Sequence, residues 1–270
     1  MHKLLTSLVI FLLTVSLAEP SAAATREEKR VRDATEALNQ LLRIPEQSVP
    51  PSLLSRAYAV AVVPNVVKAA FGVGARHGKG IIVVRQDDNT WSNPAFVALT
   101  GGGFGFQIGA QSTDIILVFK SRRGVEGITS GTLTLGADAS IAAGPVGRHS
   151  SAATDFQFQA EVYSYSRSRG LFAGIALEGT GVTMDRRANA AFYGSPDVTP
   201  EAIFSGPSGR APGSAAEFVQ LLTVQTSRLP IDSGMATSSP RPAAAPRAPE
   251  QPATVKTYGI PGSGDAEEGE

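Results

Sequence analysis

Apolar residues recur at steps of three and four along residues 26–43, which is the spacing of one face of an amphipathic helix. These positions are Val31, Ala34, Leu38, Leu41 and Leu42. Thr25 and Glu28 have the spacing of a capping box, so Thr25 is the predicted N-cap. Prolines follow and end this helix, and a second short helix is predicted over residues 51–58.

From residue 59 the pattern changes to short runs of Val, Ile, Phe and Thr separated by glycine, which is typical of β-strands. Strands are predicted over residues 59–63, 80–85, 95–99, 104–111, 114–120, 132–142, 156–166 and 171–178. Glycine weakens the interior of a strand, so its repeated use, as in Gly101–Gly103 and at Gly109, indicates bends or bulges. Two further helices are predicted over residues 186–193, ending at Gly194, and 215–228.

These elements together predict an α+β fold. Its centre is a strongly curved, mainly antiparallel, Gly-rich sheet or partial barrel, and helices flank it at the N-terminal and C-terminal ends. The helices over residues 186–193 and 215–228 are both expected to pack on the sheet.

Both ends of the chain differ from this central region. Lys3 precedes an apolar stretch over residues 4–17, and the small side chains of Ala22–Ala24 suit a signal peptidase, so residues 1–24 are predicted to be a cleaved signal peptide. An uncleaved anchor is the alternative, but the stretch is shorter than the roughly 20 apolar residues that cross a bilayer. Residues 229–270, rich in Pro, Ala, Ser and Gly, are predicted to be a disordered tail, which leaves residues 25–228 as one domain.

Composition narrows the classes of function. The chain has no cysteine, so it can form no disulfide and carries no acylated cysteine, and its stability must come from a packed core. Its 24 basic and 24 acidic residues give a net charge of zero, which does not fit a generic nucleic-acid binder. Nucleic acid is therefore not an expected partner.

The sequence contains no recognisable catalytic or metal-ligating pattern. His77 and His149 are isolated, each beside glycine and arginine, so solvated loop histidines are favoured over metal ligands. The string Gly206–Gly209 lacks the G-x-S-x-G spacing of a nucleophile elbow. The string Gly74–Gly80 is one residue short of a phosphate-binding loop. We expect no enzymatic activity, no metal and no cofactor.

Local charge is the feature that suggests a partner. Residues 65–86 contain no acidic residue, but they contain four basic ones, Lys68, Arg76, Lys79 and Arg85. Gathered on one face, such residues would bind an anionic membrane at about 1 kcal/mol each. The alternative is that they are scattered solubilising charges. The helix over residues 26–43 could instead lie in a membrane, but its basic and acidic residues are balanced, so packing on the sheet is favoured.

A series of short motifs runs in order through residues 30–205. They include Ala61-Val-Val-Pro64-Asn65-Val-Val-Lys68-Ala-Ala-Phe71-Gly72-Val-Gly74, Gly78-Lys79-Gly80, Trp91-Ser92-Asn-Pro94-Ala-Phe96, Gly105-Phe-Gln107-Ile-Gly109-Ala-Gln111, Ala143-Gly144-Pro145-Val-Gly147-Arg148 and Asn189-Ala-Ala-Phe192-Tyr193-Gly194. In these motifs the chain resembles the SYLF family, a lipid-binding domain found in eukaryotic endocytic adaptors and as stand-alone exported proteins in bacteria.

The resemblance implies binding of anionic phospholipids, without catalysis, and in fungal members binding of actin. The predicted signal peptide and the lack of an SH3 or FYVE domain depart from the eukaryotic pattern, so actin is not an expected partner. We expect an exported protein, periplasmic or on the cell surface, that associates peripherally with an anionic phospholipid membrane. The alternative is an envelope scaffold or surface interaction protein that binds a protein or polymer partner.

Five basic residues are the predicted lipid contacts. Lys68, Lys79 and Arg148 fall inside the motifs of the resemblance and carry the charge that a lipid phosphate needs. Arg76 and Arg85 flank those motifs and are included for their charge alone.

Overall fold

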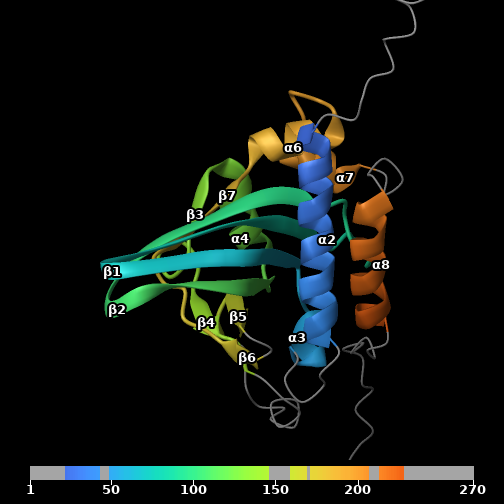
Figure 1. The fold of residues 1–270 in the computed structure, drawn as a ribbon. Helices are drawn as coiled ribbons and strands as arrows, with labels where there is room; N and C mark the ends of the chain where they lie inside the picture. Colours follow the sequence, from blue (N-terminus) through green and yellow to red (C-terminus); the bar gives the residue numbers. More distant parts are fainter. Residues whose placement is uncertain (1–21, 43–48, 146–158, 169–170, 207–212, 228–270) are drawn as a thin grey trace, which may run out of the picture. The chain divides into compact units, whose positions relative to one another are not determined.

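The structure is a computed structural model that describes residues 22–42, 49–145, 159–168, 171–206 and 213–227 (Figure 1). Most of the predicted signal peptide, the predicted disordered tail and Arg148 lie outside these residues. The predicted domain organisation therefore stays a prediction. No helix in the described part of the chain has the length and apolar character that crossing a membrane requires.

The first helix, α2, spans Ala22–Leu42 and buries the predicted face against strand β1 (Ala59–Val84) and helix α8 (Gly213–Ser227). Val31, Ala34, Leu38 and Leu41 are all at most 3% exposed, as the helical spacing predicts. The predicted N-cap at Thr25 is wrong, because the helix begins three residues earlier. The short helix α3 (Pro51–Ser55) lies where a second helix was predicted.

Within the described ranges, seven strands form one sheet, which is mostly antiparallel (Figure 1). Besides β1 they are β2 (Ala95–Phe119), β3 (Thr132–Thr134), β4 (Ile141–Ala143), β5 (Val162–Ser168), β6 (Leu171–Gly174) and β7 (Thr180–Met184). The order is β3-β7-β2-β5-β4, with β1 paired to β2 and β6 paired to β5. Of these seven strands, β4 and β5 form the one parallel pair. The sheet curls into a half-barrel with flanking helices, which confirms the predicted α+β class.

Five predicted strands turn out to be two long ones, β1 and β2, which pair with each other from Ala59↔Phe119 to Ile82↔Ala95. Glycine bends these strands but does not end their pairing. The bend brings the two halves of β1 together: a Cβ on Gly80 would lie 2.1 Å from the carbonyl oxygen of Val62. Only glycine permits this close approach of backbone to backbone.

Two hydrophobic cores lie on opposite faces of the sheet, because side chains alternate along a strand. The first core joins α2, α3, α6 (Arg186–Tyr193) and α8 to one face, and contains Leu38, Val62, Ile81, Phe96 and Phe218. The second lies on the other face with α4 (Arg122–Ser130) and α7 (Pro200–Ser205), and contains Val63, Ile82, Leu117, Ile128 and Ile203. We call these the helix face and the inner face of the sheet.

The C-terminal helices were predicted in the right places. Helix α6 ends before Gly194, whose φ of 65° is the left-handed conformation that glycine adopts readily. Helix α8 packs chiefly on α2 and α3, so the prediction that it packs on the sheet is wrong. Trp91 ties α8 to the connection between β1 and β2, because its Nε1 donates to Thr226 Oγ1 at 3.2 Å.

Replacing Gly80 with alanine should destabilise the fold by about 3 kcal/mol, because its Cβ would collide with backbone that cannot move aside. Gly102→Ala is the matched control, since Gly102 also lies in a strand and its Cβ would meet no atom closer than 3.9 Å. Urea denaturation of both variants measures the difference. Equal stability would mean that the halves of β1 do not touch.

Candidate functional site

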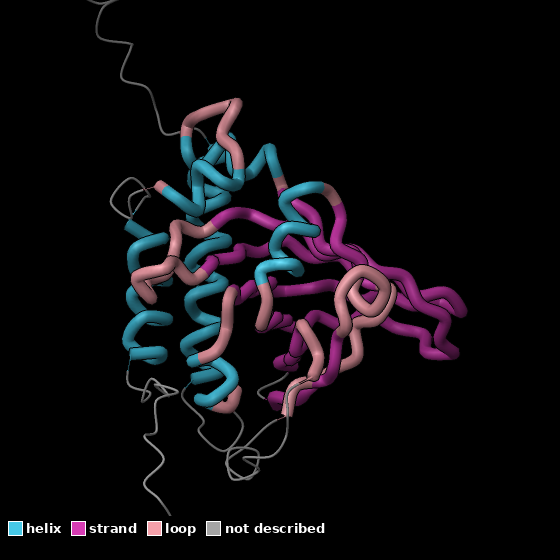
Figure 2. The backbone as a smooth tube through the Cα atoms, turned by 180° about the vertical axis from the view of Figure 1, so that it is seen from behind, coloured by secondary structure: helices cyan, strands magenta, loops and turns pink. Residues whose placement is uncertain are grey.

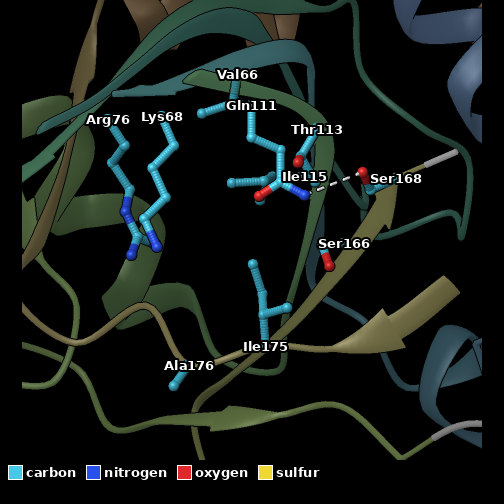
Figure 3. Close-up of a pocket in the computed structure, with 10 residues that line it drawn as sticks. All are labelled: Val66, Lys68, Arg76, Gln111, Thr113, Ile115, Ser166, Ser168, Ile175 and Ala176. Atoms are coloured by element: carbon cyan, nitrogen blue, oxygen red, sulfur yellow. Dashed lines mark hydrogen bonds between the residues drawn. The ribbon is translucent and has the colours of Figure 1, made fainter. Parts of the chain in front are cut away.

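A cavity of about 340 Å³ opens on the inner face of the sheet, where the second core ends (Figure 3). Strands β1, β2 and β5 and the segment after β6 surround it. Its lining residues are Val66, Lys68, Arg76, Gln111, Thr113, Ile115, Ser166, Ser168, Ile175 and Ala176. The set combines two cations, several neutral polar groups and an apolar floor.

Strand geometry brings the two cations together. Lys68 follows Val66 by two residues and Arg76 precedes Ile82 by six, so both share the inner face with those core residues. The bend in β1 then places the two side chains beside each other, pointing into the cavity (Figure 3). Gly101 leaves room for this arrangement, because a Cβ there would lie 3.1 Å from Cγ of Arg76.

The two cationic side chains have no direct partner in the described part of the chain, where neither the Lys68 side chain nor the Arg76 side chain forms a hydrogen bond or an ion pair. Burial lowers the pKa of Arg76, and the negative charge of Glu178 acts in the opposite direction. A guanidinium remains protonated at physiological pH. The cavity therefore holds two positive charges that are available to an anion.

Neutral polar groups also line the cavity. Gln111 Nε2 donates to Ser168 Oγ at 3.4 Å, and the hydroxyls of Thr113 and Ser166 lie nearby (Figure 3). Hydroxyls can donate and accept hydrogen bonds, so they suit the oxygen atoms of a phosphate or of a sugar alcohol. The sequence offered no signal for these four residues beyond their alternation along β2 and β5.

Lys79 lies on the helix face, because it is three residues from Arg76 and side chains alternate along a strand. Its Nζ donates to Asp185 Oδ2 at 2.7 Å. Asp185 also caps α6 by accepting from the backbone N–H of Ala188 at 3.2 Å, and Arg30 of α2 lies 3.9 Å from it. Lys79 thus joins β1 to the start of α6, and Asp185 in turn lies close to α2.

Arg85 also has internal partners. Its guanidinium donates to the carbonyl oxygens of Leu54 and Ala57, each at 2.9 Å, and lies over the ring of Trp91 at 4.4 Å from the centroid. Burial lowers its pKa. The structure thus brings together only Lys68 and Arg76 of the predicted lipid contacts, and Arg148 lies outside the described residues. The role of all five in lipid binding stays a prediction.

Among the described residues that line this cavity there is no histidine, aspartate or glutamate. The exposed His77 has Nδ1 3.2 Å from Thr100 Oγ1, on the opposite face from Arg76. Among the described residues, no three His, Cys, Asp or Glu side chains gather in a way that could hold a metal ion. What the arrangement offers chemically is charge, hydrogen bonds and an apolar floor.

The comparisons with known proteins place this fold in a family. The Ysc84 family, described as "Las17-binding protein actin regulator", matches residues 100–225. The chain is 36% identical to SH3 domain-containing YSC84-like protein 1 of Xenopus laevis over 70% of its own length, and 38% identical to protein YSC84 of Saccharomyces cerevisiae over 66%. The chain therefore belongs to the SYLF family, as its motifs predicted.

These relatives are longer proteins. The matching region covers 56% of the Xenopus protein and 38% of the yeast protein, and in the human SH3 domain-containing YSC84-like protein 1, which is 34% identical, it covers 57%. The similarity is therefore to one part of each relative, and the part it covers is the domain described above.

Replacing Asp185 with asparagine should lower the free energy of unfolding at pH 7 by about 1 kcal/mol. The effect is this small because the Lys79 side chain is 45% exposed, so solvent screens the ion pair. Burial raises the pKa of Asp185, but hydrogen bonds from Lys79 and Ala188 outweigh it and hold the pKa below 3.8. The contribution is therefore present above pH 3.8 and is lost as the pH falls through the lower pKa of the folded state.

Urea denaturation of both proteins between pH 7 and pH 3 tests this prediction, and the two curves should converge at the acidic end. Asp197→Asn serves as the control, since Asp197 is exposed. A deficit of the same size at every pH would show that the Asp185 charge does not stabilise the fold.

Proposed function

We propose that this domain binds anionic phospholipid membranes peripherally and without catalysis. The observation that carries the proposal is the pair of cations, Lys68 and Arg76, that share one cavity and have no direct acidic partner among the described residues. The acid-free stretch over residues 65–86 adds to the positive potential of this region. A membrane of anionic lipids presents the complementary charge.

Four of the predicted lipid contacts divide into two pairs with different roles. Lys68 and Arg76 face the ligand, whereas Lys79 and Arg85 act mainly through Asp185, Leu54 and Ala57. Because the sequence predicts a signal peptide, we propose that the membrane is one of the cell envelope. Anionic lipids of that membrane are the partner, with the headgroup phosphate near the two cations.

The double variant Lys68→Ala/Arg76→Ala should bind anionic vesicles about thirty-fold more weakly, because each cation contributes about 1 kcal/mol near such a surface. The variant removes exposed or half-buried side chains from a cavity wall, so the fold should stay intact. Co-sedimentation of residues 25–270 with neutral and anionic vesicles over a salt series measures the effect. Binding of the unmodified chain should weaken as salt rises.

Arg186→Ala/Arg187→Ala is the matched control for this experiment. It removes the same total charge from an exposed part of helix α6. If both double variants lose the same affinity, net charge and not the cavity governs binding. If the unmodified chain fails to bind anionic vesicles at low salt, the proposal is wrong.

A protein partner is the second candidate, and the description of the matched family favours it. That description names Las17 binding and actin regulation. Actin was not an expected partner from the sequence, and this expectation stays a prediction. Co-sedimentation of residues 25–270 with filamentous actin tests it directly. We expect the unmodified domain to pellet with the filaments no more than the Arg186→Ala/Arg187→Ala variant does. Saturable pelleting of the unmodified domain would favour the protein partner.

A further inference from the structure

The middle of the β1–β2 ladder extends beyond the rest of the sheet. β5 pairs with β2 only from Asp114 onward, and β7 pairs with β2 only from Val97 to Gly101. Residues 67–75 and 102–112, which we call the hairpin extension, therefore pair only with each other in the described part of the chain. Figures 1 and 2 show the ladder projecting away from α2 and α8.

The hairpin extension has an unusual composition for a projecting element. Its 9 and 11 residues read VKAAFGVGA and GGFGFQIGAQS, and Lys68 is the one charged residue in them. Val67 is 51% exposed, and Ala69, Ala75 and Ala110 are also exposed. Projecting β-hairpins in water normally carry charged side chains that keep other chains away. An apolar one indicates that this segment meets an apolar environment.

Its position relative to the cations identifies that environment. Lys68 is the second residue of the β1 segment of the hairpin extension, and Arg76 comes directly after that segment ends. Both cations therefore lie at the base of the hairpin extension. The ladder bends where its register shifts, between Ala70 and Gly72. This bend lies about three residues beyond Lys68, or about 10 Å at about 3.3 Å per residue. Interfacial protein elements bury their apolar parts to a depth of about 5–10 Å.

We propose that the hairpin extension inserts into the bilayer, with its apolar residues at the boundary between headgroups and acyl chains while Lys68 and Arg76 hold the lipid phosphates. The inference rests on the proposed membrane function and specifies how the domain sits on the membrane. Backbone groups on the paired edges of the two strands bond to each other, which limits the cost of entering this layer. The bilayer is the occupant that matches both the apolar segment and the two cations at its base.

Because the chain has no cysteine, single-cysteine variants report on the membrane contact without other changes. Ala69→Cys on the hairpin extension and Ser195→Cys after helix α6 are both exposed positions. Each is introduced into residues 25–270, which retain all of the described buried core residues and lack the apolar stretch over residues 4–17. Each carries a polarity-sensitive fluorophore and is mixed with vesicles of phosphatidylglycerol and phosphatidylcholine, with and without a quencher on the acyl chains.

We expect a blue shift and acyl-chain quenching for the label at position 69 and neither for the label at position 195. Vesicle binding without a blue shift at position 69 would overturn the insertion and leave the proposed function standing. Absence of vesicle binding in the same samples would overturn both. The co-sedimentation readout therefore separates the two failures.

An unlabelled pair of variants supplies a second readout. Val67→Asn should weaken vesicle binding severalfold and most visibly at high salt, where screening leaves the apolar contribution dominant. Val224→Asn is the matched control, because Val224 is also an exposed apolar residue, 38% exposed, but lies on helix α8. Equal binding by the two variants at all salt concentrations would contradict insertion.

Discussion

The fold depends on the close approach of the two halves of strand β1. Gly80 lies so near the carbonyl of Val62 that a single methyl group would separate them. Because the halves touch, both contribute to both cores: Val62 and Ile81 pack under the helices, and Val63 and Ile82 pack on the inner face. Because β1 bends back on itself in this way, the hairpin extension lies outside the cores.

The close approach of the two halves of β1 also determines which basic side chains are available to a ligand. Residues an even number of positions apart share a face of a strand, and the bend sets Lys68 next to Arg76. Lys79 falls on the other face, where Asp185 and the helices engage it. A run of basic residues that reads as one cluster in the sequence is thus divided into a pair available to a ligand and a pair that holds the domain together.

The sequence predicted what depends on local pattern. Helical spacing identified the buried face of α2, and a glycine after an apolar run identified the end of α6. It missed helix α4, which contains Gly124 and Gly127, both poor helix formers, and which forms because Val125 and Ile128 are buried against the sheet. It divided β1 into separate strands because glycine usually interrupts one. The hydroxyls of Thr113 and Ser166 came together only through pairing of strands far apart in the chain.

We propose that the domain meets the membrane with the cavity and the adjoining hairpin extension. Hydrogen–deuterium exchange of residues 25–270, with and without anionic vesicles, tests it most directly because it reports on every segment at once. We expect slower exchange in residues 67–76 and 102–112 when vesicles are present, with no change in α6 and α8. Protection confined to α2 or α6, with the hairpin unchanged, would contradict it.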